Sequence, residues 1–377
     1  MSSRRIVHRR TTQAGTRYDV RLRAPDGQQF TRSFRTRRDA DAFARDQLST
    51  LQRGTWIDPS GGAMLFGDWV DEWMEQRVGL RPKTLHTDTG IIERDLRPVF
   101  GAQPLSLITP REVQRLIATW SRRLAPNTVR RNYAVVRAIF NAAVDADLIA
   151  RTPCRSVKLP RPEPTAHRIL DPAELRRLAE AVPVDYRAMV YLAGVLGLRF
   201  GECAGLRIGR LDFFRKTLTV AESLGEVGGE LVAGSPKSRA SRRTLAVPAP
   251  LMELLAAHLA RRGLTAADHD AFVFSAPQGG PVRYATFRSR VWLPAVSDAN
   301  VKGVTFHSLR HLAATAMVVE GVDIRTAQHR LGHSDPRLLL NIYAHVSSDG
   351  DRDAARRLGE RFLTDERDKA LQSDAQR

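Results

Sequence analysis

Two stretches rich in proline and glycine divide the chain and limit how it can fold. Asp58-Pro59-Ser60-Gly61-Gly62 is the first of them. Lys158-Leu159-Pro160-Arg161-Pro162-Glu163-Pro164 is the second, and its closely spaced prolines favour an extended, stiff conformation. A chain of 377 residues is long enough for two or three domains. We therefore expect a domain over residues 1–60, another over 65–155, and a third over 165–363.

Residues 1–60 have the pattern of a small β-sheet followed by a helix. Apolar and polar residues alternate around residues 18–22, and residues 29–35 form a second strand candidate with Phe30 and Phe34 on one face. Strands that carry arginine can enter the major groove of DNA, although the same side chains can simply keep a small domain soluble. The predicted DNA contacts of this segment are Arg17, Arg21, Arg23, Arg32 and Arg35.

Residues 65–148 have a helical pattern, with apolar residues at steps of three and four. A long helix is expected after Pro126, and its polar face carries Arg130 and Arg131. These two arginines are predicted to lie along DNA phosphates. The aromatic residues of this segment are explained by the helical period as core residues.

The remainder of the chain mixes helices with short strands. A buried helix is expected to end at Gly197, strands are expected over 218–220, 234–237 and 243–247, and a helix over 251–259. Residues 364–377 are expected to be a disordered tail.

Net charge indicates the kind of partner. The chain has a formal charge of +18 and a pI near 10.9, which is typical of proteins that bind a polyanion, most often nucleic acid; a basic surface without a partner is the alternative. Two cysteines form neither a disulfide framework nor a metal cluster. No signal peptide or membrane-spanning run is recognisable, so we expect a soluble, cytoplasmic protein.

One constellation of residues suggests chemistry on a phosphodiester. Gly197-Leu198-Arg199-Phe200-Gly201-Glu202, His307-Ser308-Leu309-Arg310-His311 and Leu331-Gly332-His333 precede Tyr343. A tyrosine oxygen can attack phosphorus if cations stand where the phosphate charge develops. Guanidinium groups can supply that charge, so no metal or other cofactor is required.

These segments resemble the conserved boxes of the tyrosine recombinases, the phage integrase family. Pro236-Lys237-Ser238, followed by Arg242-Arg243-Thr244, resembles the hairpin that carries the lysine of that family. Residues 65–155 resemble its core-binding domain, and residues 1–60 resemble the arm-binding domain of integrases related to that of phage lambda. The resemblance implies a multidomain α+β fold in which a mainly α-helical catalytic domain contains a small β-sheet. It implies these catalytic residues: Arg199, Lys237, His307, Arg310, His333 and Tyr343.

The implied roles have structural alternatives. Arg199 and Arg310 would grip the phosphate, but Arg199 could instead form an ion pair with Glu202 one helical turn away. His307 and His333 would hydrogen-bond the phosphate or move a proton. The spacing of His307 and His311 also suits zinc, but Ser308 stands where the zinc-protease motif has glutamate.

Lys237 would be the general acid for the departing 5′-oxygen, although by itself it is an ordinary basic-loop residue. Tyr343 by itself could be a half-buried helix tyrosine. Arg242 and Arg243 are predicted to contact DNA.

The resemblance implies a phage or integrative-element integrase that cuts and rejoins double-stranded DNA attachment sites through a 3′-phosphotyrosyl intermediate. It also implies a homotetramer on DNA, with possible accessory DNA-bending proteins or an excision factor, and no membrane. A helix around Leu358 and Phe362 has an apolar stripe that could dock on a neighbouring protomer or on its own chain. Three alternatives remain: a chromosome-dimer resolvase, a type IB topoisomerase, and a non-enzymatic DNA-binding regulator.

Overall fold

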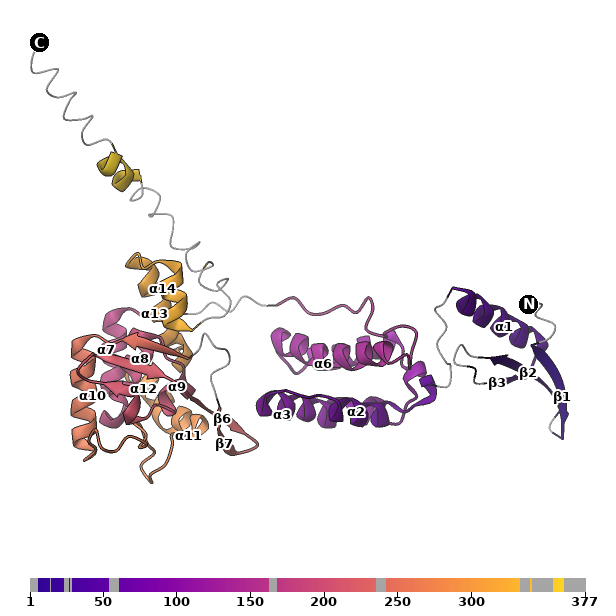
Figure 1. Ribbon diagram of the computed structural model, residues 1–377, viewed down its shortest axis with the longest axis horizontal. Coiled ribbons are helices and arrows are strands. Elements are labelled where there is room, and N and C mark those ends of the chain that lie inside the picture. Colours follow the sequence, from indigo (N-terminus) through magenta and orange to yellow (C-terminus); the bar gives the residue numbers. More distant parts are fainter. Residues whose placement is uncertain are drawn as a thin grey trace, which may run out of the picture. The chain divides into compact units, whose positions relative to one another are not determined.

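The computed structural model of the chain describes residues 6–13, 15–23, 27, 29–53, 61–162, 168–234, 242–332, 340 and 355–362. The chain divides into two compact units, Met1–Pro164 and Thr165–Arg377. Figure 1 shows the elements of each unit. The boundary between the units falls at the end of the second proline-rich stretch.

The first part of the chain is an antiparallel three-stranded sheet with one helix. Strands β1 (Val7–Thr12), β2 (Gly15–Arg23) and β3 (Gln29–Phe34) lie in the order β1-β2-β3, and α1 (Arg37–Gln52) packs on one face (Figure 1). Val20 and Leu22 meet Ala40 and Ala44 of α1 in a small core. The two expected strands and the helix are confirmed. Strand β1 was not expected, because its sequence VHRRTT has no alternation of apolar and polar residues.

The helical pattern expected over residues 65–148 is confirmed, and the last helix of this segment ends at Asp145. The α-helices are α2 (Phe66–Glu75), α3 (Pro82–Ile91), α4 (Arg97–Phe100), α5 (Pro110–Ser121) and α6 (Pro126–Asp145). Thr109 begins α5 with a capping box: its side chain accepts from the Glu112 N–H, and the Glu112 carboxylate accepts from the Thr109 N–H. Phe66, Phe100 and Phe140 lie together in a separate core.

The second unit combines helices with two small sheets. Its helices are α7 (Pro172–Ala181), α8 (Val184–Leu196), α9 (Phe200–Ala204), α10 (Ala249–Arg261), α11 (Tyr284–Phe287), α12 (Leu293–Asp298), α13 (Phe306–Val319) and α14 (Ile324–Leu331). One sheet has the order β4-β5-β8, formed by β4 (Leu211–Asp212), β5 (Thr217–Val220) and β8 (Arg243–Ala246). A hairpin, β6 (Ser223–Val227) and β7 (Glu230–Gly234), is the other.

The expected strands over 218–220 and 243–247 are confirmed as β5 and β8. The strand expected over 234–237 overlaps β7 only at Gly234, and residues 235–237 lie outside the described part of the chain. The expected helix ending at Gly197 is confirmed as α8, which packs against α7, α10 and α13. No helix among the described residues is long and apolar enough to cross a membrane.

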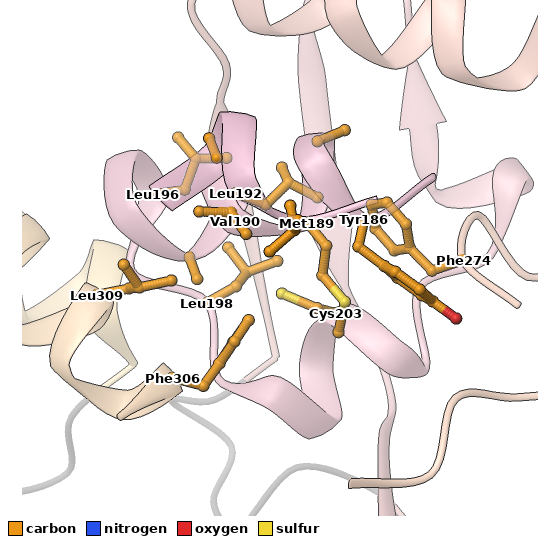
Figure 2. Close-up of a cluster of buried hydrophobic side chains, with 14 of the residues drawn as sticks. Tyr186, Met189, Val190, Leu192, Leu196, Leu198, Cys203, Phe274, Phe306 and Leu309 are labelled. Carbon is orange, nitrogen blue, oxygen red and sulfur yellow. The ribbon is translucent and has the colours of Figure 1, made fainter. Parts of the chain in front are cut away.

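One hydrophobic core supports the box segments around Arg199 and Arg310. Leu198, Cys203 and Leu309 are each at most 1% exposed, and Figure 2 shows them in one cluster with side chains of α8. These three residues are the sequence neighbours of Arg199, Glu202 and Arg310. Close packing of the three apolar side chains therefore fixes the backbone that carries the three charged ones.

The separate cores lead to a prediction about Phe140→Ala. Removal of this fully buried ring should destabilise the helical segment by about 3–5 kcal/mol. Hydrogen exchange followed by mass spectrometry should show faster exchange in peptides of residues 65–155, with peptides of residues 168–332 unchanged. Phe362→Ala is the matched control, because Phe362 is 68% exposed. Faster exchange throughout the chain in Phe140→Ala would contradict independent cores.

Candidate active site

Arg199 lies where a turn connects α8 to α9. The helix α8 ends at Gly197, whose φ of +73° is accessible to glycine at little cost. Arg199 is then the N-cap residue of α9, and Glu202 is three residues further on. Glu202 Oε2 accepts from the Arg199 backbone N–H at 2.9 Å, and Glu202 Oε1 accepts from Arg199 Nη1 at 2.9 Å. The ion pair considered as an alternative role for Arg199 therefore exists, and it orients the side chain.

Glu202 is shared with a second arginine, Arg243 at the start of β8. Arg243 donates from Nη1 to Oε1 and from Nη2 to Oε2 of Glu202, each at 3.1 Å. Both side chains are buried, at 0% and 2% exposure. Burial by itself raises the pKa of the Glu202 carboxyl, but the hydrogen bonds and charges of Arg243 and Arg199 outweigh it, so the pKa lies below its ordinary value. Glu202 is therefore ionised at neutral pH.

Arg310 approaches the same region from α13. It donates from Nη1 to the Gly197 carbonyl at 2.6 Å and from Nη2 to the Leu331 carbonyl. Burial, with the like charge of Arg199 as a second cause, lowers the pKa of Arg310 to about 9, which leaves it charged at neutral pH. The Arg199 side chain is 34% exposed and can meet a ligand directly, whereas Arg310 is 2% exposed.

The end of α14 joins these arginines. Three successive carbonyl oxygens accept hydrogen bonds, each from a different arginine: Arg330 from Arg243 Nε at 2.8 Å, Leu331 from Arg310 Nη2, and Gly332 from Arg199 Nη2 at 3.2 Å. Carbonyls at a helix C-terminus have no partner within the helix and carry partial negative charge, so cations stabilise them. The box that contains Arg199 and the box that contains Gly332, which lie more than 100 residues apart in the sequence, therefore meet here.

The histidine pair lies at the beginning of α13. His307 is exposed in the first turn, and its ring packs edge to face on that of His311, with centroids 4.9 Å apart. Among the residues that the structure describes, no group of three or more histidine, cysteine or acidic side chains could hold a metal ion. The predicted site residues Lys237, His333 and Tyr343 lie outside the described part of the chain.

Arg243 requires a correction. It was predicted to contact DNA, but its guanidinium has no exposed surface, and each of its three nitrogens donates to Glu202 or to the Arg330 carbonyl. It acts inside the domain. Its neighbour Arg242 is exposed, as strand alternation requires. The sequence pattern R-R-T could not by itself identify the buried member of the pair, because that depends on which face of β8 packs against the domain.

The register of the N-terminal sheet shows on which face each of the other predicted DNA contacts lies. Arg32 is paired with Val20 across the ladder, so it lies on the face that α1 covers, where its guanidinium carbon is 5.0 Å from the Phe43 ring centroid. Arg17, Arg21 and Arg23 lie on the opposite, open face. Arg35 is exposed between β3 and α1.

Two residues of the open face, Arg10 and Asp19, were missed. Arg10 of β1 is paired with Arg17 across the ladder, and its Nε is 3.1 Å from Asp19 Oδ2. Ser33 donates to the other oxygen of Asp19, which is 6% exposed. Recognition of Arg10 depended on recognising β1.

Arg130 and Arg131 are both exposed on α6. Arg130 Nη1 donates to the Pro160 carbonyl at 3.2 Å, so this arginine holds the proline-rich stretch against the helix. Arg131 lines a hollow together with Arg94 and Arg123. Both remain predicted DNA contacts.

Comparisons with known proteins agree with the geometry. Two family profiles match the chain: "Phage integrase family" over residues 168–349 and "Phage integrase, N-terminal SAM-like domain" over residues 65–121. The integrase of Mycobacterium phage L5 is 28% identical over 311 residues, which cover 80% of this chain and 83% of that protein.

Two solved structures show the same fold. The Tn1549 transposon integrase in complex with circular intermediate DNA has a TM-score of 0.68 at 19% identity, covering 78% of this chain and 99% of that one. A lambda integrase tetramer bound to a Holliday junction has a TM-score of 0.56 at 19% identity, covering 89% of this chain and 94% of that one. The expected fold class is thereby confirmed.

The contact between the boxes leads to a prediction about Gly197→Ala. An added Cβ would lie 2.4 Å from Leu331 Cδ2, so it should push the end of α14 away from Arg310. Gly263→Ala is the control, because Gly263 has a similar φ of +66° and nothing within 4 Å. Both variants should lose about 1–2 kcal/mol of unfolding free energy through backbone strain. Urea denaturation should show a larger loss for Gly197→Ala, and hydrogen exchange should be faster in α14 for that variant alone. Equal effects of the two variants would show that the packing of Gly197 against Leu331 tolerates an added methyl group.

Proposed function

Because the chain belongs to the phage integrase family and is a tyrosine-type site-specific recombinase, we propose that Tyr343 is its nucleophile and cuts DNA through a 3′-phosphotyrosyl bond. The attack frees a 5′-hydroxyl, and the hydroxyl of a partner strand later attacks the phosphotyrosyl bond. The phosphodiester energy is retained in the covalent link, so rejoining needs no nucleotide cofactor. Tyr343 follows Leu331-Gly332-His333 at the interval that the family pattern has.

One observation carries this proposal: Arg199 and Arg310 converge on the end of α14, the segment that leads in sequence to His333 and Tyr343. A pentacoordinate phosphorane has more negative charge than the phosphodiester, so fixed guanidinium groups stabilise the transition state more than the bound substrate. Arg199 and Arg310 have this role in the proposal. Lys237 protonates the leaving 5′-oxygen, and His307 and His333 hydrogen-bond the phosphate or move the tyrosine proton.

The proposed substrate is a pair of double-stranded DNA attachment sites. The Tn1549 integrase was solved with circular intermediate DNA, and lambda integrase was solved as a tetramer on a Holliday junction, which supports a homotetramer here. Within this chain, Leu358 and Phe362 are 56% and 68% exposed, which favours docking of their helix on a neighbouring protomer. Accessory DNA-bending proteins or an excision factor complete the proposed assembly.

The proposed division of labour follows the three domains. Residues 165–363 perform the chemistry, residues 65–155 bind the core site through Arg130 and Arg131, and residues 1–60 bind a flanking arm site through Arg17, Arg21, Arg23 and Arg35. Arg242 contacts DNA beside the catalytic residues. Tethering several DNA-binding modules raises the effective concentration of each one for its site.

A covalent adduct tests the proposed nucleophile. The wild-type chain, incubated with a nicked duplex that carries the junction sequence flanking its gene, should form an adduct visible on a denaturing gel. Tyr343→Phe should form none, because the phenyl ring lacks the attacking oxygen, and Tyr284→Phe should serve as the control with an undiminished yield. An adduct that persists in Tyr343→Phe would disprove the assignment. Adducts that rejoin only to their original partner strand would indicate a topoisomerase.

The open face of the N-terminal sheet gives a second test. Arg21→Gln should reduce the slope of log K against log salt concentration by about 1 on a duplex, because one phosphate contact and its released counterion are lost. Arg32→Gln should leave the slope unchanged, since Arg32 lies on the helix-covered face over Phe43. Fluorescence anisotropy across a salt series measures both. A loss of slope in Arg32→Gln alone would place the DNA on the other side of the domain.

A further inference from the structure

Arg243 has a fully buried side chain and has no part in the mechanism described so far. Its guanidinium connects three elements: β8, from which it projects, α9 through Glu202, and α14 through the Arg330 carbonyl. Gly332 packs directly against it, because a Cβ on that glycine would lie 2.8 Å from Arg243 Nη1. The same guanidinium therefore touches both partners that hold Arg199: the Glu202 carboxylate and the turn whose carbonyl Arg199 binds.

Stability alone does not account for a buried ion pair of this kind. Taking two charges out of water costs several kcal/mol per ion, and replacement of a buried pair by apolar residues of similar volume is often neutral or stabilising. What a bidentate pair supplies is orientation: two parallel N–H···O bonds fix a carboxylate in its plane. Here the oriented oxygen is Oε1, which accepts from Arg199 and Arg243 together.

The excess of positive charge around Glu202 also indicates that Arg243 serves to orient its neighbours. Three guanidinium groups, Arg199, Arg243 and Arg310, surround one carboxylate, Glu202, so the cluster keeps an excess of positive charge. Like charges repel, and without a fixed centre the exposed member, Arg199, would turn toward solvent. Arg243 is fully buried and makes no contact with an outside anion, but it keeps Glu202 in place for the arginine that does.

We propose that Arg243 is a positioning residue for strand cleavage: acting through Glu202 and the end of α14, it holds Arg199 in the orientation that meets the scissile phosphate. This inference rests on the proposed function. It assigns Arg243 an effect on the chemical step rather than on DNA binding. Misplacement of a catalytic group by about 1 Å can slow a reaction by about 100-fold, so an indirect contact is sufficient for a large effect.

The pH dependence of cleavage separates positioning from simple structural support. Among the residues that the structure describes, the charged and titratable groups around Glu202 are Arg199 at the start of α9, Arg243 on β8, Arg310 on α13 and the thiol of Cys203. In the wild type the pKa of Glu202 is lowered, so the carboxylate stays ionised as the pH falls toward 6. Without Arg243, burial acts against fewer opposing charges and the pKa rises. A variant lacking Arg243 should then lose the Glu202–Arg199 contact, and with it cleavage, as the pH falls through the raised pKa.

The experiment measures single-turnover cleavage by the full chain on the nicked junction duplex, at a series of pH values, together with DNA affinity and urea denaturation. Arg243→Lys retains the charge but cannot make the bidentate contact and the Nε bond together. It should cleave about 10- to 100-fold more slowly than the wild type, because a misplacement of about 1 Å costs up to about 100-fold, and its DNA affinity should stay within about 2-fold of the wild-type value. Arg243→Met should be at least as slow and should show the additional fall in rate at low pH.

Two further variants keep the test decisive. Arg207→Met is the control, because Arg207 in the same unit pairs with Glu222 and donates to the Asp270 carbonyl; its cleavage rate and pH profile should equal those of the wild type. The double variant Arg243→Met, Glu202→Leu removes both charges together. It should recover unfolding free energy relative to Arg243→Met but should remain slow in cleavage.

Wild-type cleavage rates in Arg243→Lys, an unchanged pH profile in Arg243→Met, or full activity in the double variant would each overturn the positioning role. If Arg243→Met does not fold, the comparison of Arg243→Lys with the double variant decides the question. Failure of the wild-type chain to form the Tyr343 adduct would instead overturn the proposed function, so the two failures are distinguishable.

Discussion

The carboxylate of Glu202 is the interaction on which the catalytic region depends. It is 2% exposed, it accepts from the backbone and side chain of Arg199, and it accepts both Nη groups of Arg243. Without it, three arginines would stand close together with no opposing charge, and the turn after α8 would lose its cap. The ion pair that seemed to compete with a catalytic role for Arg199 is therefore the means by which Arg199 acquires a defined direction.

An electrostatic cluster of this kind requires a rigid frame, and the hydrophobic core supplies it. Leu198, Cys203 and Leu309 pack in the core, one residue away from Arg199, Glu202 and Arg310 respectively (Figure 2). The glycines have the complementary task. Gly197 and Gly332 both have positive φ, and a Cβ on either would enter the space of Leu331 or Arg243. The apolar residues hold the backbone in place, and the glycines let three segments approach closely enough for side chains to reach carbonyls.

Sequence patterns were informative where the signal is local. Alternation located β2 and β3, and the boxes brought Arg199 and Arg310 into one site. The alternation of side chains along a strand could also have placed Arg32. It lies two residues from both Phe30 and Phe34, so it had to share their face. The burial of Arg243 could not be predicted, because it depends on contacts with α9 and α14, which are distant in sequence.

The open face of the N-terminal sheet resembles the catalytic cluster on a smaller scale, because it also places one buried acid among several arginines. Asp19 is 6% exposed at the centre of that face, where it accepts from Ser33 and pairs with Arg10, while Arg17, Arg21 and Arg23 surround it on the same strand. A carboxylate among arginines weakens the total positive charge, which would be a disadvantage if charge alone determined DNA binding. Its benefit is geometric, since the ion pair fixes the direction of Arg10. In both places one buried acid is outnumbered by arginines, so the surface keeps its attraction for phosphate and gains a defined orientation.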